Sequence, residues 1–210
     1  MQPLSPNFDL YLVSDRRQTR PRDLLWVLER ALDGGVKGIQ LREKDLGGRE
    51  LFDLAEKVKA LCVDRQASLF INDRVDVALA VDADGIHLGG ASIPIEAARA
   101  LVGTDKLIGV STHSMREAEE AERSGADFLL FGPIYFTPSK ADYGEPQGLA
   151  PLKEVVEKIS IPVYAIGGIK VGNIGDVKEA GVRGVALISA IMSSVDPCRA
   201  TQEILGILQR

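Results

Sequence analysis

The sequence predicts an α/β protein, a single (β/α)8 TIM barrel that spans residues 1–210. Short runs rich in Val, Ile and Leu alternate with amphipathic segments in about eight units. The runs are almost uniformly apolar, so both faces of the sheet must be covered, which with helical crossovers means parallel strands. Similar stretches recur at roughly every second unit, as expected of a ring. They are GGVKGIQLR, AVDADGIHLG, SGADFLLFG and AGVRGVALIS.

The predicted elements follow one another along the whole chain. The strands, each a short apolar run, are expected within residues 8–15, 38–44, 68–73, 85–89, 107–113, 127–133, 161–168 and 183–191. The amphipathic helices are expected within residues 23–32, 48–61, 74–81, 93–102, 114–125, 152–160, 173–181 and 197–210. Gly34, Gly125 and Gly181 are expected to end helices in the left-handed conformation. One long loop, 134–150, follows the sixth strand. An open doubly wound sheet is the alternative, but no GxGxxG follows the first strand.

Composition excludes several classes of function. A net charge of −5 argues against a nucleic-acid or membrane surface, because such surfaces need clustered Lys and Arg. No run reaches the roughly 18 apolar residues of a membrane span, and the first ten residues do not resemble a signal peptide, so the cytoplasm is the expected location. Cys62 and Cys198 lie far apart and outside any CxxC, which suggests neither a disulfide framework nor a zinc cluster.

The second strand carries the most informative polar pattern. In a barrel the site lies at the carboxyl ends of the strands. Gln40, Arg42 and Lys44 are spaced by two and therefore share one face, opposite Ile39 and Leu41. If the apolar pair faces the helices, the amide and two cations line the barrel mouth, where an anionic ligand would offset their desolvation. Alternatively, the two cations extend to solvent or pair with neighbouring acids.

Asn72 and Asp73 end the third strand. Either could cap the following helix, because Asn and Asp satisfy its first free N–H groups. The other could hold a hard cation such as Mg²⁺, which uses one or two carboxylates together with phosphate oxygens and water. Ser111 and His113 end the fifth strand. With His87 and His113 as the only histidines, on different strands, a histidine metal cluster is not supported, and His87 is interpreted as a core residue.

The last three strands end in groups that suit phosphate. Thr137, Ser139 and Lys140 present two hydroxyls and an ammonium on the long loop. The seventh strand ends at Gly167 and Gly168, and the eighth ends at Ile188 and Ser189. Backbone N–H groups and a helix start at this place form the recurrent phosphate site of barrels. An ordinary solvated turn is the alternative for the long loop.

The stretches QLREK, INDRVDVALAVDADGIHLG, GVSTHS, GPIYFTPSK, AIGGI and ISAI, in this order, resemble the thiamine phosphate synthase family over nearly the whole chain. The resemblance implies a (β/α)8 barrel transferase of thiamine biosynthesis. Such an enzyme joins hydroxymethylpyrimidine diphosphate to a thiazole phosphate and releases pyrophosphate with the help of Mg²⁺. The implied partners are small phosphorylated substrates. Barrels often pair, so a homodimer is a further expectation.

The resemblance also assigns roles. It implies that pyrimidine diphosphate is bound by Gln40, Arg42, Lys44, Asn72, Ser111 and Lys140. It implies that thiazole phosphate is bound by Thr137, Ser139, Gly168, Ile188 and Ser189, and Mg²⁺ by Asp73. We expect Arg42, Lys44 and Lys140 to stabilise the departing pyrophosphate, and we group Ser111 with them as catalytic. We place His113 among the substrate contacts.

One position departs from the family pattern. The family carries Gln and two acids after HLG, and the second acid is the other Mg²⁺ ligand, whereas this chain has Gly90, Ala91 and Ser92. The sequence therefore predicts an incomplete metal site, in which Asp73, diphosphate and water hold Mg²⁺. A related thiazole tautomerase works without metal and uses a histidine at the position of His113. That isomerase, and a catalytically silent protein that binds thiazole phosphate, are the alternatives to the synthase.

Overall fold

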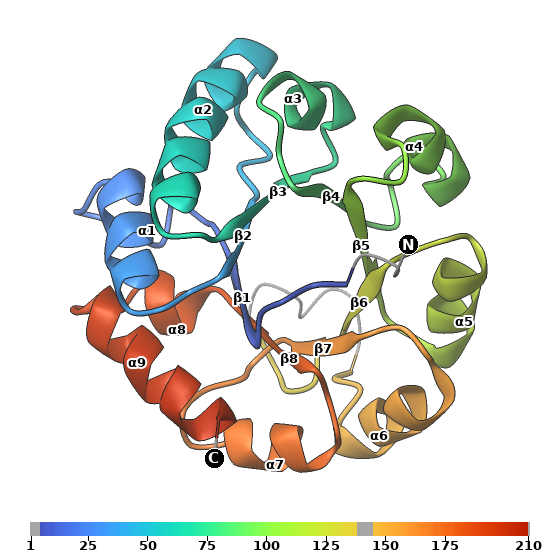
Figure 1. Ribbon diagram of the computed structural model, residues 1–210. Coiled ribbons are helices and arrows are strands. Elements are labelled where there is room, and N and C mark those ends of the chain that lie inside the picture. The colour runs from blue at the N-terminus through green and yellow to red at the C-terminus, as the bar shows by residue number, and fades with distance from the viewer. Residues whose placement is uncertain (1–4, 138–144, 210) are drawn as a thin grey trace.

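The computed structural model describes residues 5–137 and 145–209, and its parallel strands close into a barrel in chain order (Figure 1). Each strand pairs with the next along the chain, and β8 returns to pair with β1 through Leu12 and Leu187. The strands are β1 Leu10–Val13, β2 Gly38–Leu41, β3 Ser68–Asn72, β4 Gly85–Leu88, β5 Leu107–Thr112, β6 Phe128–Phe131, β7 Val163–Ile166 and β8 Gly184–Leu187. The predicted (β/α)8 barrel is confirmed.

The helices form a ring around the strands (Figure 1). They are α1 Leu24–Asp33, α2 Gly48–Asp64, α3 Val75–Ala80, α4 Ile95–Val102, α5 Met115–Arg123, α6 Leu149–Lys158, α7 Ile174–Glu179, α8 Ser189–Met192 and α9 Pro197–Leu208. The sequence did not separate α8 from the eighth strand, because Leu187, Ile188 and Ile191 form one apolar run. Among the described residues, no helix is long and apolar enough to cross a membrane.

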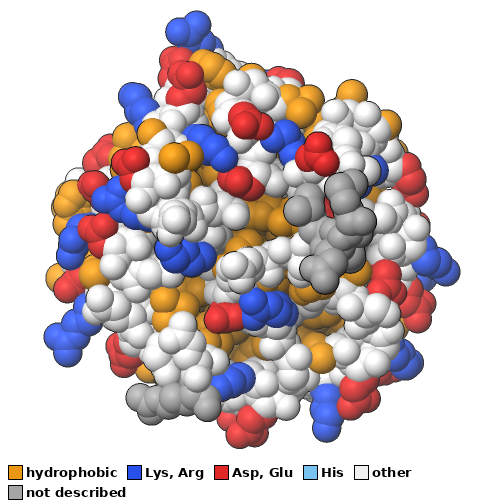
Figure 2. Space-filling model, viewed as in Figure 1, with side chains coloured by type: hydrophobic (Ala, Val, Ile, Leu, Met, Phe, Trp, Pro, Cys, Tyr) orange, Lys and Arg blue, Asp and Glu red, His pale blue; other side chains and the backbone are white. Residues whose placement is uncertain are grey.

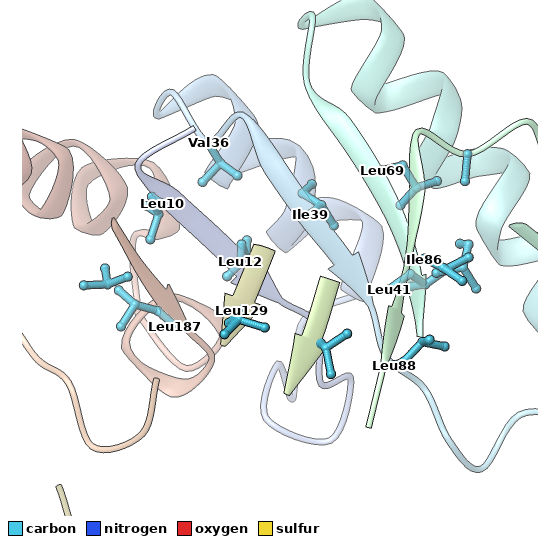
Figure 3. Close-up of a cluster of buried hydrophobic side chains, with 14 of the residues drawn as sticks. Leu10, Leu12, Val36, Ile39, Leu41, Leu69, Ile86, Leu88, Leu129 and Leu187 are labelled. Atoms are coloured by element: carbon cyan, nitrogen blue, oxygen red, sulfur yellow. The ribbon is translucent and has the colours of Figure 1, made fainter. Parts of the chain in front are cut away.

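Two apolar layers hold the barrel together. The outer layer lies between strands and helices and includes Ile39, Leu41 and Ile86 (Figure 3). The inner layer fills the barrel with aromatic rings, several of which meet edge to face, as Phe70 and Phe128 do with 5.4 Å between their ring centroids. Its buried members are Phe8, Tyr11, Val13, Phe70, Leu107, Phe128, Leu130, Tyr164 and Ala186. The interior is therefore a packed core, and a ligand must bind at an end of the barrel.

Glycines on the strands make room for the inner rings. A Cβ atom on Gly109 would lie 2.3 Å from Phe128 Cζ and 2.6 Å from His87 Nδ1. A Cβ atom on Gly85 would lie 2.6 Å from Phe70 Cε1 and 2.3 Å from the carbonyl oxygen of Leu107. No side chain fits at these distances, so the two glycines permit the close packing of the barrel interior.

One predicted helix cap is wrong. Gly125 and Gly181 adopt the left-handed conformation as expected, with φ of +94° and +85°. Gly34 instead has a helical φ of −74°, and the left-handed residue is the next one, Gly35, with φ of +109°. Gly34 is required for a different reason, because its Cβ atom would lie 2.6 Å from the carbonyl oxygen of Cys198 on α9.

Charges of both signs alternate on the surface. On the face drawn in Figure 2, Lys and Arg side chains lie among Asp and Glu around the ring of helices, while hydrophobic side chains show at the centre.

Candidate active site

The second strand delivers its polar residues as the period of two predicts. Ile39 and Leu41 belong to the outer apolar layer, and Gln40 between them is 2% exposed. Arg42 follows on the same side as Gln40, close enough to His87 inside the barrel for its charge to act on that ring. The predicted orientation is confirmed for the strand itself: Ile39 and Leu41 face the helices, and the Gln40 amide between them faces the barrel.

A buried carboxylate that the sequence reading missed fixes this strand end. Glu43 is 5% exposed and accepts a hydrogen bond of 2.6 Å from the Ser14 hydroxyl. It also accepts one of 3.2 Å from the backbone N–H of Arg16. Ser14 in turn accepts a hydrogen bond of 2.9 Å from the backbone N–H of Arg42. The sequence did contain a signal for this role of Glu43: a carboxylate on the helix-facing side of a strand needs partners that offset its desolvation.

Asn72 and Asp73 do not cap α3, so this part of the sequence prediction is wrong. The cap position is occupied by Arg74, and no side chain caps the helix. Asp73 has a positive φ of 61°, which turns the chain at the strand end. Its Oδ2 atom accepts a hydrogen bond of 2.7 Å from the Asn72 amide. Both side chains are therefore kept at the end of β3 instead of being used by the helix.

Ser92 occupies the position where the family pattern has a second acid, and it contacts Asp73. The Ser92 hydroxyl hydrogen-bonds to Asp73 Oδ1. The same hydroxyl accepts a hydrogen bond of 2.7 Å from the backbone N–H of Gly89. A cavity of about 240 Å³ next to Asp73 is lined also by Asn72 and Lys44, which brings the ends of β2 and β3 together.

Ser111 is joined to a histidine inside the barrel. His87 Nε2 lies 3.0 Å from Ser111 Oγ, while Nδ1 has no hydrogen-bond partner among the described residues. Burial, and secondarily the charge of Arg42, lower the pKa of His87 to about 3. The ring is therefore neutral at physiological pH and can exchange one hydrogen bond with Ser111. Interpreting His87 as a core residue was correct for its burial and missed this contact.

The strand ends on the other side of the barrel lie close together. The backbone N–H of Tyr135 donates to the carbonyl of Gly167 over 3.0 Å, so the loop after β6 runs along the end of β7. Gly168 has a positive φ of 67°, and its Cβ atom would lie 2.9 Å from the carbonyl oxygen of Phe136. Thr137 is thereby placed in the chain directly after this contact. Only glycine fits at position 168.

Of the remaining predicted site residues, the structure describes the positions of some and not of others. Ile188 and exposed Ser189 follow β8 directly, and Ser189 begins α8. His113 is exposed, and its Nδ1 atom lies 2.5 Å from the carbonyl oxygen of Gly132, at the edge of the mouth. Ser139 and Lys140 lie outside the described residues. Among those described, no group of three or more His, Cys, Asp and Glu could hold a metal ion.

Known proteins resemble this chain over nearly its whole length. The family model described as thiamine monophosphate synthase matches residues 10–191. A protein of Geobacter sulfurreducens is 52% identical over 202 residues, 96% of this chain and 95% of its own. The thiamine-phosphate synthase of Desulfitobacterium hafniense (strain Y51) is 46% identical over 204 residues, 97% of this chain and 99% of its own. The solved structure of thiamine phosphate pyrophosphorylase from Pyrococcus furiosus superposes with a TM-score of 0.88 at 40% identity, covering 96% of each chain.

Proposed function

Because the chain belongs to the thiamine monophosphate synthase family, we propose that it joins hydroxymethylpyrimidine diphosphate to thiazole phosphate to give thiamine phosphate and pyrophosphate. The observation that carries the proposal is the match of residues 10–191 to the family. At the barrel end, Asn72 pairs in register with His87, and His87 contacts Ser111 and feels the charge of Arg42. The thiazole tautomerase has no support among the relatives described above.

The reaction needs a good leaving group. The exocyclic C–O bond of the pyrimidine breaks and its electron pair leaves with pyrophosphate. The lone pair of the thiazole nitrogen then forms the new C–N bond. Arg42, Lys44 and Lys140 would stabilise the negative charge that develops on the diphosphate. Ser111, oriented by His87, would hold the pyrimidine, and Gly168 and Ser189 would offer N–H and hydroxyl donors to the thiazole phosphate.

The oxygen donors around Asp73 fit a magnesium ion. Asp73 supplies a carboxylate, and the Asn72 amide and Ser92 hydroxyl already contact its two oxygens. Mg²⁺ is commonly bound by one or two carboxylates, with substrate phosphate and water as further ligands. When bound, it would neutralise part of the diphosphate charge. We propose that Asp73 holds Mg²⁺ as the single carboxylate ligand, with Ser92 positioning its Oδ1 atom.

The activity test uses purified protein with both substrates and Mg²⁺, and follows thiamine phosphate as its fluorescent oxidation product. We expect product that is lost in EDTA, and a decrease in kcat/KM of about 100-fold or more for Arg42→Ala, because a donor to the developing charge is removed. Arg30→Ala is the matched control, since Arg30 lies in the last turn of α1 and pairs with Asp33. Turnover of a thiazole carboxylate phosphate alone, dependent on His113, would instead support the tautomerase.

The magnesium proposal predicts the effect of restoring the second acid. Ser92→Asp should lower the Mg²⁺ concentration for half-maximal activity by roughly tenfold, because charge count sets the affinity of oxygen sites for divalent cations. Ser92→Asn is the control of similar size without charge, and should not lower it. An equal Mg²⁺ requirement in wild type and Ser92→Asp would contradict the assigned role of position 92. The expected homodimer and cytoplasmic location stay predictions.

A further inference from the structure

A cavity of about 430 Å³ lies beside the loop that joins β1 to α1. The loop forms most of its wall, and Asp45, after β2, completes it. Among the described residues, none of those predicted to bind substrate lines this cavity. Its volume is within the range of small-molecule pockets. We call it the arginine cavity, because its lining includes Arg16, Arg17, Arg20 and Arg22.

The charges of the arginine cavity are unequal, with four arginines against Asp23 and Asp45. Asp45 is the partner of Arg16 at 2.6 Å and of Arg17 at 2.8 Å. Asp23 caps α1 by accepting a hydrogen bond of 2.8 Å from the N–H of Leu25. The wall therefore has an excess of positive charge, in a chain whose net charge is −5.

Two of the four guanidinium groups have no carboxylate partner among the described residues. Arg22 donates to backbone carbonyls at the end of α8 and just after it, including those of Met192 and Val195 at 3.3 Å each. Arg20 is exposed and forms no hydrogen bond or ion pair with any described residue. Like charges gathered in one cavity repel one another unless an anion lies between them.

We propose that the arginine cavity binds a diphosphate group, with Arg17, Arg20 and Arg22 as its donors. The planar guanidinium fork presents paired N–H groups that match phosphate oxygens. Arginines spread around a cavity of about 430 Å³ suit two linked phosphates better than a single small anion. The diphosphate could be free pyrophosphate or the end of a diphosphate ester. The site does not depend on the reaction proposed above, because none of the residues that line it is among those assigned to the substrates.

The chain contains a natural reporter for this site. Trp26 is its only tryptophan, it is 42% exposed, and the Arg22 guanidinium carbon lies 5.7 Å from the centre of its ring. An anion bound to Arg22 would change the charge next to the indole ring and hence its fluorescence.

The experiment titrates the full-length protein, without Mg²⁺ and at constant ionic strength, with sodium pyrophosphate while Trp26 fluorescence is recorded. We expect a saturable change, and a weakening of at least about tenfold in Kd for Arg20→Gln, because one charge-assisted donor is lost. Arg17→Gln is a second variant for the same test. Arg30→Gln on α1 should bind as the wild type does. Methyl diphosphate and inorganic phosphate, titrated separately, distinguish an ester from free pyrophosphate and either from a general anion effect.

Several results would overturn the proposal. These are no saturable change, an unchanged Kd in both Arg20→Gln and Arg17→Gln, or an equal response to chloride. Loss of the signal in Arg42→Ala would also overturn it, because the binding would then belong to the substrate site that contains Arg42. Circular dichroism of each variant separates loss of binding from loss of folding.

Discussion

At the scale of single residues, His87 combines a structural cost with a positioning role. The ring is 1% exposed, lies on β4 inside the barrel, and contacts Ser111 at the base of the mouth. Burial lowers its pKa to about 3 from an ordinary value of 6.5. Below pH 6.5, His87 therefore becomes protonated in the unfolded chain and stays neutral in the folded chain.

This difference predicts how stability depends on pH. Between pH 6.5 and 3 the unfolded state binds one more proton than the folded state. The contribution of His87 to the free energy of unfolding is therefore complete above pH 6.5 and decreases as the pH is lowered. From pH 7 to pH 5 the loss that His87 contributes should be about 2 kcal/mol. His87→Gln cannot take up this proton. Urea denaturation at both pH values should show a loss smaller by that amount in the variant.

The comparison uses the difference between the two pH values, so any overall change in stability caused by the substitution cancels. If the wild type and His87→Gln lost the same free energy between pH 7 and pH 5, the buried neutral state of His87 would be contradicted.

At the scale of elements, the face of a strand on which each side chain lies could be predicted from the sequence, whereas the residue that caps a helix could not. The alternation in the second strand placed Gln40 and Arg42 correctly, because a strand has only two faces. The expected cap by Asn72 or Asp73 failed, because the positive φ of Asp73 carries the chain past both residues before α3 begins. Contacts between distant segments, such as Glu43 with Ser14, depend on the closed barrel and have no local pattern.

At the scale of the whole molecule, the recurrence noticed at every second unit has a structural basis. The residue directly before β2, β4, β6 and β8 is charged and connects its strand to a neighbouring segment. Asp84 Oδ2 accepts hydrogen bonds of 2.8 Å from both the Leu69 N–H and the Lys59 ammonium. Before β8, Arg183 pairs with Asp9, the residue directly before β1. The sequence repeat therefore corresponds to charged residues at the amino ends of alternate strands. These residues bind neighbouring segments through hydrogen bonds and ion pairs.

Asp127, before β6, is the member of this series whose removal should be most costly. Its Oδ2 atom accepts hydrogen bonds of 2.6 Å from the Ile108 N–H on β5 and 2.5 Å from the Arg99 guanidinium on α4. Asp127→Ala would leave both donors without this acceptor in a partly buried place, and should lower the free energy of unfolding by about 3 kcal/mol. Equilibrium urea denaturation at neutral pH measures this loss.

The two interactions of Asp127 predict how much stability a milder substitution removes. Asp127→Asn keeps an oxygen for the Ile108 N–H and removes only the charge opposite Arg99, so its loss should be clearly smaller than that of Asp127→Ala. Asp105→Ala is the surface control, because Asp105 is exposed and its hydrogen bond is one of 3.3 Å from Thr104. It should change stability by no more than about 0.5 kcal/mol. Equal stabilities of Asp127→Ala and Asp105→Ala would mean that the charged residues before alternate strands do not hold the barrel together.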